Sequence, residues 1–183
     1  KFSYLFPERF PHFMRAKREN FTFQSKAYRT NRNSPSTNTV NYQEALDWLY
    51  ATQTFGIKLG LEGPTRLLRE FLAFPSHRTK VIHVAGTNGK GSTCAMIDAL
   101  GQGLALRSGL FTSPHLIDYR ERVRVNGLEI TKEKTANLLT ELRELVADWE
   151  HHPTFFELTL ALGMRHFRDL DCDLIVLETG MGG

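Results

Sequence analysis

The sequence predicts an α/β protein whose parallel sheet is covered by helices on both faces. Three observations support this class. Apolar, strand-like runs alternate with segments of helical periodicity, a glycine-rich stretch follows one of those runs, and the apolar residues 174–177 end in the acid Glu178, as a buried parallel strand would. Such alternation implies right-handed crossovers, so the carboxyl ends of the strands should meet at one edge of the sheet.

Length and composition indicate one globular domain, with 183 residues, 41% of them hydrophobic and 23% charged. No apolar run approaches the roughly 18 to 20 residues that span a bilayer, and no secretory signal is recognisable. The two cysteines, Cys94 and Cys172, lack paired spacing, which argues against a disulfide scaffold or a zinc cluster. We therefore expect a cytoplasmic protein with no membrane partner.

Residues 1–40 differ from the rest of the chain in charge. They hold eight Lys or Arg residues against two Glu residues, a net charge of +6, which leaves −3 for residues 41–183. This basic, aromatic tail could contact RNA or a membrane surface, or serve as an organellar presequence. Because a polar spacer precedes an abrupt start of helical periodicity, we instead expect the tail to be disordered or not native, with no nucleic-acid partner.

Two helices are expected before the first strand. Apolar residues at helical spacing predict one from residue 42, and Pro64 suits the first position of a second, which ends before Pro75. The segment between them, residues 57–61, is on its own an ordinary interhelical loop. The apolar positions of the two helices are Tyr42, Ala45, Leu46, Leu49 and Tyr50, then Leu67, Leu68, Phe71 and Leu72.

Residues 81–93 predict a strand, a phosphate-binding loop and the start of a helix. Gly86, Gly89 and Gly91 permit backbone angles and close approaches that let successive amides point at a polyanion, and Lys90 adds a positive charge. The helix start near Ser92 places unpaired N–H groups at the same spot. The general P-loop pattern is not met at either end, so a plain glycine-rich turn is the alternative.

The next elements follow in order from residue 92. A helix over residues 92–104 should turn Met96, Ala99 and Leu100 inward, and a strand at 109–111 delivers residues 112–116 to the carboxyl edge of the sheet, where ligands collect. Those residues could equally form a Ser-Pro turn. The Asn126-Gly127 step predicts a two-residue hairpin.

Two more helices and a strand complete the prediction. Thr131 should cap a long helix, and Thr154 and Glu157 match the spacing of a capping box that begins another. Glu178 then closes the last strand, either as a magnesium-binding acid or as an ordinary strand-end residue. The apolar positions of the two helices are Leu138, Leu142, Leu145, Val146 and Trp149, then Leu158, Leu162 and Phe167.

Residues 86–92, Gly-Thr-Asn-Gly-Lys-Gly-Ser, resemble the phosphate loop of folylpolyglutamate synthases and dihydrofolate synthases, the folate branch of the Mur ligase family. Residues 57–61, 112–116, 154–157 and 178–183 resemble further motifs of that family, in the same order. The resemblance implies a Mur-ligase-type central ATPase domain, a three-layer fold with a parallel sheet and P-loop, beginning near residue 41. It also implies that this domain is truncated at residue 183 and that a C-terminal ligase domain is absent.

The resemblance also implies roles for individual residues. Lys90 would act in catalysis, and Ser113 and Glu178 would bind Mg²⁺. His115 and Glu157 would lie at the edge of the substrate site, although the first role expected for Glu157 is that of a helix cap. The ATP-binding residues would be Gly86, Thr87, Asn88, Gly89, Lys90, Gly91 and Ser92. The pterin or folate site would be lined by Lys58, Leu59, Gly60, Thr154, Phe155 and Phe156.

The function implied for the intact protein is ATP-dependent ligation of L-glutamate to dihydropteroate, to the γ-carboxyl of a reduced folate, or to both, through an acyl phosphate. We expect a monomer that binds ATP, L-glutamate and one of these acids. Gly63-Pro64 departs from the family's pattern after Glu62, and the histidine and lysine that the family carries later do not occur here. A non-catalytic nucleotide-binding module is therefore the alternative, whereas an unrelated P-loop kinase or GTPase is disfavoured.

Overall fold

The computed structural model describes residues 41–55 and 60–180. The predicted tail at 1–40, the predicted substrate residues Lys58 and Leu59, and the last three residues of the motif at 178–183 lie outside the described residues. No helix in the described part is long and apolar enough to cross a membrane.

A five-stranded mixed sheet forms the centre of the described region, in the order β1-β5-β2-β3-β4. Strands β1 (Lys80–Val84), β5 (Leu174–Glu178) and β2 (Ser108–Phe111) are parallel, which confirms the predicted parallel core of the sheet. The predicted hairpin, β3 (Val123–Val125) and β4 (Leu128–Glu129), adds to β2 in the antiparallel sense. Its turn has positive φ at both Asn126 and Gly127, as a type I′ turn requires.

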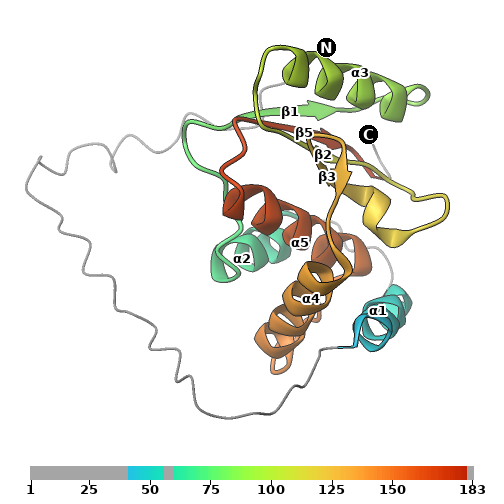
Figure 1. Ribbon diagram of the computed structural model, residues 1–183. Coiled ribbons are helices and arrows are strands. Elements are labelled where there is room, and N and C mark those ends of the chain that lie inside the picture. Colours follow the sequence, from blue (N-terminus) through green and yellow to red (C-terminus); the bar gives the residue numbers. More distant parts are fainter. Residues whose placement is uncertain (1–40, 56–59, 181–183) are drawn as a thin grey trace, which may run out of the picture. The chain divides into compact units, whose positions relative to one another are not determined.

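Helices cover both faces of the sheet, so the fold has three layers (Figure 1). Helix α3 (Lys90–Gly103) lies on one face, whereas α1 (Tyr42–Ala51), α2 (Glu62–Glu70), α4 (Lys132–Val146) and α5 (Phe155–Asp169) pack on the other. Short 3₁₀ helices, η1 (Thr52–Phe55) and η2 (Tyr119–Arg122), follow α1 and precede β3. Helix α2 begins at Glu62, two residues before Pro64, where the sequence predicts its first position.

Most of the apolar core lies between the sheet and the helices α1, α2, α4 and α5. Leu49, Leu67, Leu142, Leu162 and Phe167 are fully buried there, in agreement with the helical spacing read from the sequence. The second core, between the sheet and α3, is small. It contains Cys94, Leu110, Leu174 and Val176.

The predicted inward face of α3 is wrong. Met96 and Leu100 are 60% and 69% exposed, and Ala99 is also exposed. The buried side of the helix instead carries Cys94, Asp98 and Gly101. A Cβ on Gly101 would lie 2.6 Å from Leu174 Cδ2, so the helix approaches the sheet closely through its small residues. Close packing through small side chains leaves no apolar stripe to mark that face.

Candidate functional site

Residues 81–93, which contain the expected phosphate loop, form the predicted strand, loop and helix start. β1 ends at Val84, and Gly89 occupies the N-cap position of α3 with φ 75° and ψ 6°, a left-handed conformation suited to glycine. No side chain caps the first turn of α3. The unpaired amides of that turn are therefore available to an anionic ligand.

Lys90, the first residue of α3, folds back over this loop. Its ammonium Nζ donates a hydrogen bond of 2.9 Å to the carbonyl oxygen of Gly86. The positive charge thus lies beside the same backbone that the glycines open, at the carboxyl edge of the sheet.

The Glu178 carboxylate meets both the phosphate loop and the loop after β2. Parallel pairing aligns Glu178 with Val84 at the ends of β5 and β1. Its Oε2 accepts a 2.9 Å hydrogen bond from the backbone N–H of Ser113. A Cβ built on Gly91 would lie 3.7 and 3.8 Å from the two carboxylate oxygens, so the side chain reaches the first turn of α3. The structure therefore brings together the phosphate loop, Ser113 and Glu178, which lie far apart in the sequence.

The carboxylate is largely shielded from solvent. Glu178 is 8% exposed. The neighbouring thiol of Cys94 has its pKa raised to about 11, first by burial and then by the negative charge of Glu178. That thiol is therefore protonated and unreactive at neutral pH.

These groups present oxygen atoms suited to a hard cation. The Ser113 hydroxyl forms no hydrogen bond with any residue that the structure describes, and within the same residues the side chain of Glu178 forms one hydrogen bond, through Oε2. A hydroxyl and a carboxylate are ligands that Mg²⁺ accepts while it keeps several waters. Within residues 41–55 and 60–180, no cluster of three or more His, Cys, Asp and Glu side chains could hold a metal by itself.

The loop after Ser113 is fixed by one carboxylate that the sequence did not single out. Glu121 accepts backbone hydrogen bonds from Leu116 (2.9 Å), Ile117 (2.8 Å) and Asp118 (2.7 Å). These donors lower the pKa of the Glu121 carboxyl to about 2. The spacing of Asp118 and Glu121, which form a capping box around η2, is the sequence pattern that could have revealed it.

His115 lies in this loop, in contact with Arg122. Its Nδ1 accepts a 2.8 Å hydrogen bond from Arg122 Nε, so the ring is neutral with its proton on Nε2. Burial and then the positive charge of Arg122 lower the pKa of His115. The ring also packs edge-on against Tyr119, at a centroid distance of 6.2 Å.

Thr154 and Glu157 form the predicted capping box at the start of α5. The Thr154 hydroxyl accepts from the N–H of Glu157 (3.3 Å), and the Glu157 carboxylate accepts from the N–H of Thr154 (2.7 Å). Glu157 therefore has the capping role predicted first for it. A Cβ on Gly63 would lie 3.5 Å from Glu157 Oε1, which places the start of α2 beside the start of α5.

The two aromatic residues after Thr154 are held by other rings. Phe155 stacks on Tyr50, with centroids 5.6 Å apart and planes at 15°. Phe156 meets Phe111 edge-on at 5.9 Å. The sequence did not indicate either contact, because the partners lie far apart along the chain. Gly60, the one described residue of the expected substrate segment 58–60, is exposed with φ 138°.

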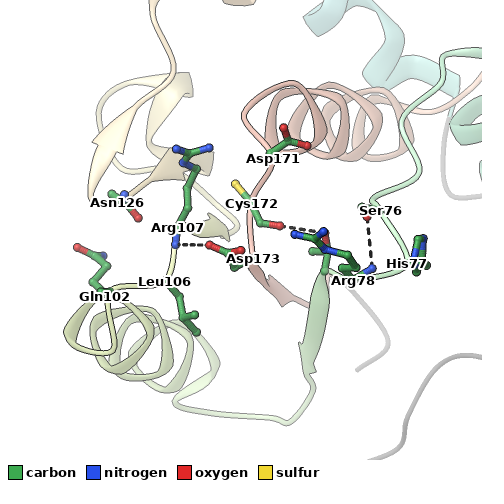
Figure 2. Close-up of a pocket in the computed structure, with 12 residues that line it drawn as sticks. Ser76, His77, Arg78, Gln102, Leu106, Arg107, Asn126, Asp171, Cys172 and Asp173 are labelled. Carbon is green, nitrogen blue, oxygen red and sulfur yellow. Dashed lines mark hydrogen bonds between the residues drawn. The ribbon is translucent and has the colours of Figure 1, made fainter. Parts of the chain in front are cut away.

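A hollow with a volume of about 860 Å³ lies at the opposite edge of the sheet (Figure 2). Its walls include Thr79, Arg107 and Asp173, each of which directly precedes a parallel strand. Both acidic and basic side chains line it, and none of the predicted site residues does. The predicted site is instead assembled at the carboxyl ends of the strands.

Comparison with known proteins identifies relatives of this chain. The chain is 37% identical over 147 residues to the dihydrofolate synthase/folylpolyglutamate synthase of Bacillus subtilis, a match that covers 78% of this chain. The chain belongs to that family. No family model matches it.

Solved folylpolyglutamate synthases share the fold. The enzyme from Thermotoga maritima aligns over 78% of this chain with a TM-score of 0.70 and 33% identity. A bifunctional folylpolyglutamate synthase/dihydrofolate synthase with Mn, AMPPNP and L-glutamate bound aligns over 76% of the chain, with a TM-score of 0.68 and 30% identity. The chain spans about a third of the length of each of these three relatives, 34% in every case.

Proposed function

We propose that the protein carrying this chain ligates L-glutamate to dihydropteroate, to the γ-carboxyl of a reduced folate, or to both, with ATP as co-substrate. The observation that carries the proposal is the convergence of the phosphate loop, Ser113 and Glu178 at one edge of the sheet. Its support from the comparisons is a relative solved with a nucleotide analogue, a divalent metal and glutamate.

The nucleotide phosphates would bind the loop at the start of α3. The uncapped amides of that turn and the ammonium of Lys90 would neutralise charge on the γ-phosphate while the substrate carboxylate attacks it. Lys90 already hydrogen-bonds the loop, so it would exchange the Gly86 carbonyl for a phosphate oxygen. Holding the two reactants in place supplies much of the rate enhancement in such reactions.

Ser113 and Glu178 would hold the magnesium ion. When bound, Mg²⁺ would offset the negative charge that develops on the phosphate oxygens. The hydrogen bond from the Ser113 N–H to Glu178 Oε2 fixes the carboxylate at the end of β5. The hydroxyl of Ser113 and Glu178 Oε1 would then face the cation.

The acid substrate would lie toward the start of α5. Thr154, Phe155 and Phe156, with the segment at 58–60, remain the proposed pterin-binding residues. Because the Phe155 and Phe156 rings are packed against Tyr50 and Phe111, they would serve as a rigid apolar wall for the pterin.

The test is an assay of ATP- and glutamate-dependent ligation on dihydropteroate and on tetrahydrofolate, with the full-length protein. Lys90→Ala and Glu178→Gln should each lower kcat/KM at least about 100-fold, as loss of a group that stabilises the transition state does. The matched controls are Lys132→Ala, at the first position of α4, and Glu129→Gln, at the end of β4. Both should retain near-normal turnover.

Three results would decide between the alternatives. Normal turnover in Lys90→Ala would refute the role given to that residue. Nucleotide binding by the wild-type protein without ligation of either acid would instead indicate a non-catalytic nucleotide-binding module. Turnover with only one of the two acids would assign the substrate.

A further inference from the structure

Arg122 lies at the same edge of the sheet as the candidate site. It immediately precedes β3, and its carbonyl oxygen accepts a 3.1 Å hydrogen bond from the N–H of Thr112, the residue before Ser113. Strands are spaced about 4.8 Å apart, so the start of β3 is about 10 Å across the sheet from Glu178, on the side away from the phosphate loop.

The Arg122 side chain is buried without a counter-ion. Arg122 is 7% exposed, and no carboxylate in residues 41–55 and 60–180 forms an ion pair with it. The neighbouring Arg120 and Arg124 behave differently, because both pair with Glu129. Burial lowers the pKa of Arg122. A buried cation without a partner is destabilising, so a function is needed to explain it.

Only part of the guanidinium is engaged by the protein. Nε donates to His115 Nδ1 at 2.8 Å, and the group lies over the Phe155 ring at 5.3 Å from its centroid. The two terminal nitrogens, Nη1 and Nη2, form no hydrogen bond with the described residues. Neither nitrogen is among the fully buried polar atoms that lack a partner, so both keep some contact with solvent. Arg124 Nε, in contrast, is fully buried and unpaired.

The available donors limit the geometry of a ligand. Because His115 occupies Nε, a carboxylate cannot bind side-on across Nε and one Nη. It can bind end-on to the Nη1 and Nη2 pair, which matches the spacing of its two oxygens. The partly exposed rings of Tyr50 and Phe155 lie next to this position.

We propose that the Nη1 and Nη2 atoms of Arg122 hold the carboxylate of the acid substrate end-on, beside the Phe155 wall, before one of its oxygens attacks the γ-phosphate. The inference rests on the proposed ligation for the identity of that acid. The nucleotide is a less suitable partner, since the phosphate loop after β1 is a further strand away from β3 than Glu178 is. Arg122 would thereby orient the acid between the aromatic wall and the metal residues.

The experiment compares variants of the full-length protein by steady-state kinetics and by thermal unfolding. Arg122→Met removes the charge at similar length, and it should raise the KM for the acid substrate at least tenfold. The KM values for ATP and glutamate should change less than twofold. The Tm without ligands should stay level or rise, because an unpaired buried charge is lost.

Two further variants separate recognition from structure. Arg122→Lys keeps the positive charge but loses the paired Nη1 and Nη2 donors, so it should raise the KM for the acid by less than Arg122→Met does. It replaces Arg122→Met as the test variant if that variant does not fold. Arg124→Met, in the adjacent strand β3, is the control and should leave every KM unchanged.

Other outcomes would overturn the proposal. A rise confined to the KM for ATP would assign the guanidinium to the nucleotide, and a fall in Tm with all KM values altered would make Arg122 structural. Calorimetric titration with dihydropteroate distinguishes this inference from the proposed function. If the wild-type protein binds dihydropteroate and Arg122→Met does not, but neither acid is ligated, the proposed ligation is refuted and the role of Arg122 stands. If both proteins bind dihydropteroate equally well, the role of Arg122 is refuted.

Discussion

Helices α5 and α3 pack on opposite faces of the same sheet, yet they are built differently. α5 begins with a reciprocal capping box and buries seven residues spread along its length. α3 begins at a glycine with no side-chain cap and buries little more than Cys94, Asp98 and Gly101. The stability of α5 therefore comes from its own sequence and from packing, whereas α3 leaves its first amides unpaired beside the phosphate loop.

The difference shows where stability and binding are separated in this fold. A cap at the start of α3 would satisfy the amides that the proposed phosphate site uses, so under the proposed function the missing cap is a cost of binding. The core between the sheet and α5 offsets that cost. The following substitutions test this division, beginning with the largest expected change in the free energy of unfolding.

Removal of a core side chain from α5 should have the largest effect. Leu162 is fully buried, so Leu162→Ala should lower the free energy of unfolding by about 2 to 5 kcal/mol through lost burial and the cavity it leaves. Leu100→Ala in α3 is the matched control. Its side chain is 69% exposed, and the expected change is within about 0.5 kcal/mol. Urea denaturation measures both, and equal losses would show that α3 is covered in solution.

A methyl group added between the sheet and α5 should have a smaller effect. A Cβ on Gly109 would lie 2.7 to 3.0 Å from ring carbons of Phe167, which is fully buried and cannot easily move. Gly109→Ala should therefore cost about 1 to 3 kcal/mol of stability. Gly103→Ala, at the end of α3, meets open space and should stabilise by up to about 1 kcal/mol. Thermal unfolding compares the pair, and a neutral Gly109→Ala would contradict the close approach of α5.

Loss of the α5 cap should have the smallest effect of the three. Thr154→Ala removes the acceptor for the Glu157 N–H and should cost about 1 kcal/mol. Thr93→Ala in α3 removes a hydroxyl that donates only to the Gly89 carbonyl, and it should change stability by less than about 0.5 kcal/mol. Unfolding without ligands measures both changes. If Thr93→Ala cost as much as Thr154→Ala, the contrast between the two helix starts would fail.

The contrast also explains which parts of the fold were predictable from sequence. Local rules decided α5 and the hairpin, because the capping box and the Asn126-Gly127 turn are written in neighbouring residues. The inward face of α3 was predicted wrongly, since Met96 and Leu100 point to solvent whereas Cys94 and Gly101 face the sheet. Apolar spacing identifies a buried face only where burial uses large side chains.

The candidate site was predictable only in part. The loop at 86–92 and the strand ending in Glu178 were visible as patterns, and parallel pairing brought them together as expected. Arg122 was missed because a charged residue at the start of a hairpin strand suggests solvent exposure, whereas tertiary packing, which includes contacts with His115 and Phe155, buries it. The stacking of Phe155 on Tyr50 likewise joins distant residues that no local rule connects.

The hydrogen bonds to the carboxylate of Glu121 affect how strongly the proposed ligands would bind. Three amides of the loop after Ser113 converge on it, so a segment without regular secondary structure is ordered when the chain folds. Fixing one residue of a mobile loop costs about 1 to 2 kcal/mol in conformational entropy. A ligand that meets Ser113 and His115 on an already ordered loop avoids that loss, and more of its contact energy remains as affinity.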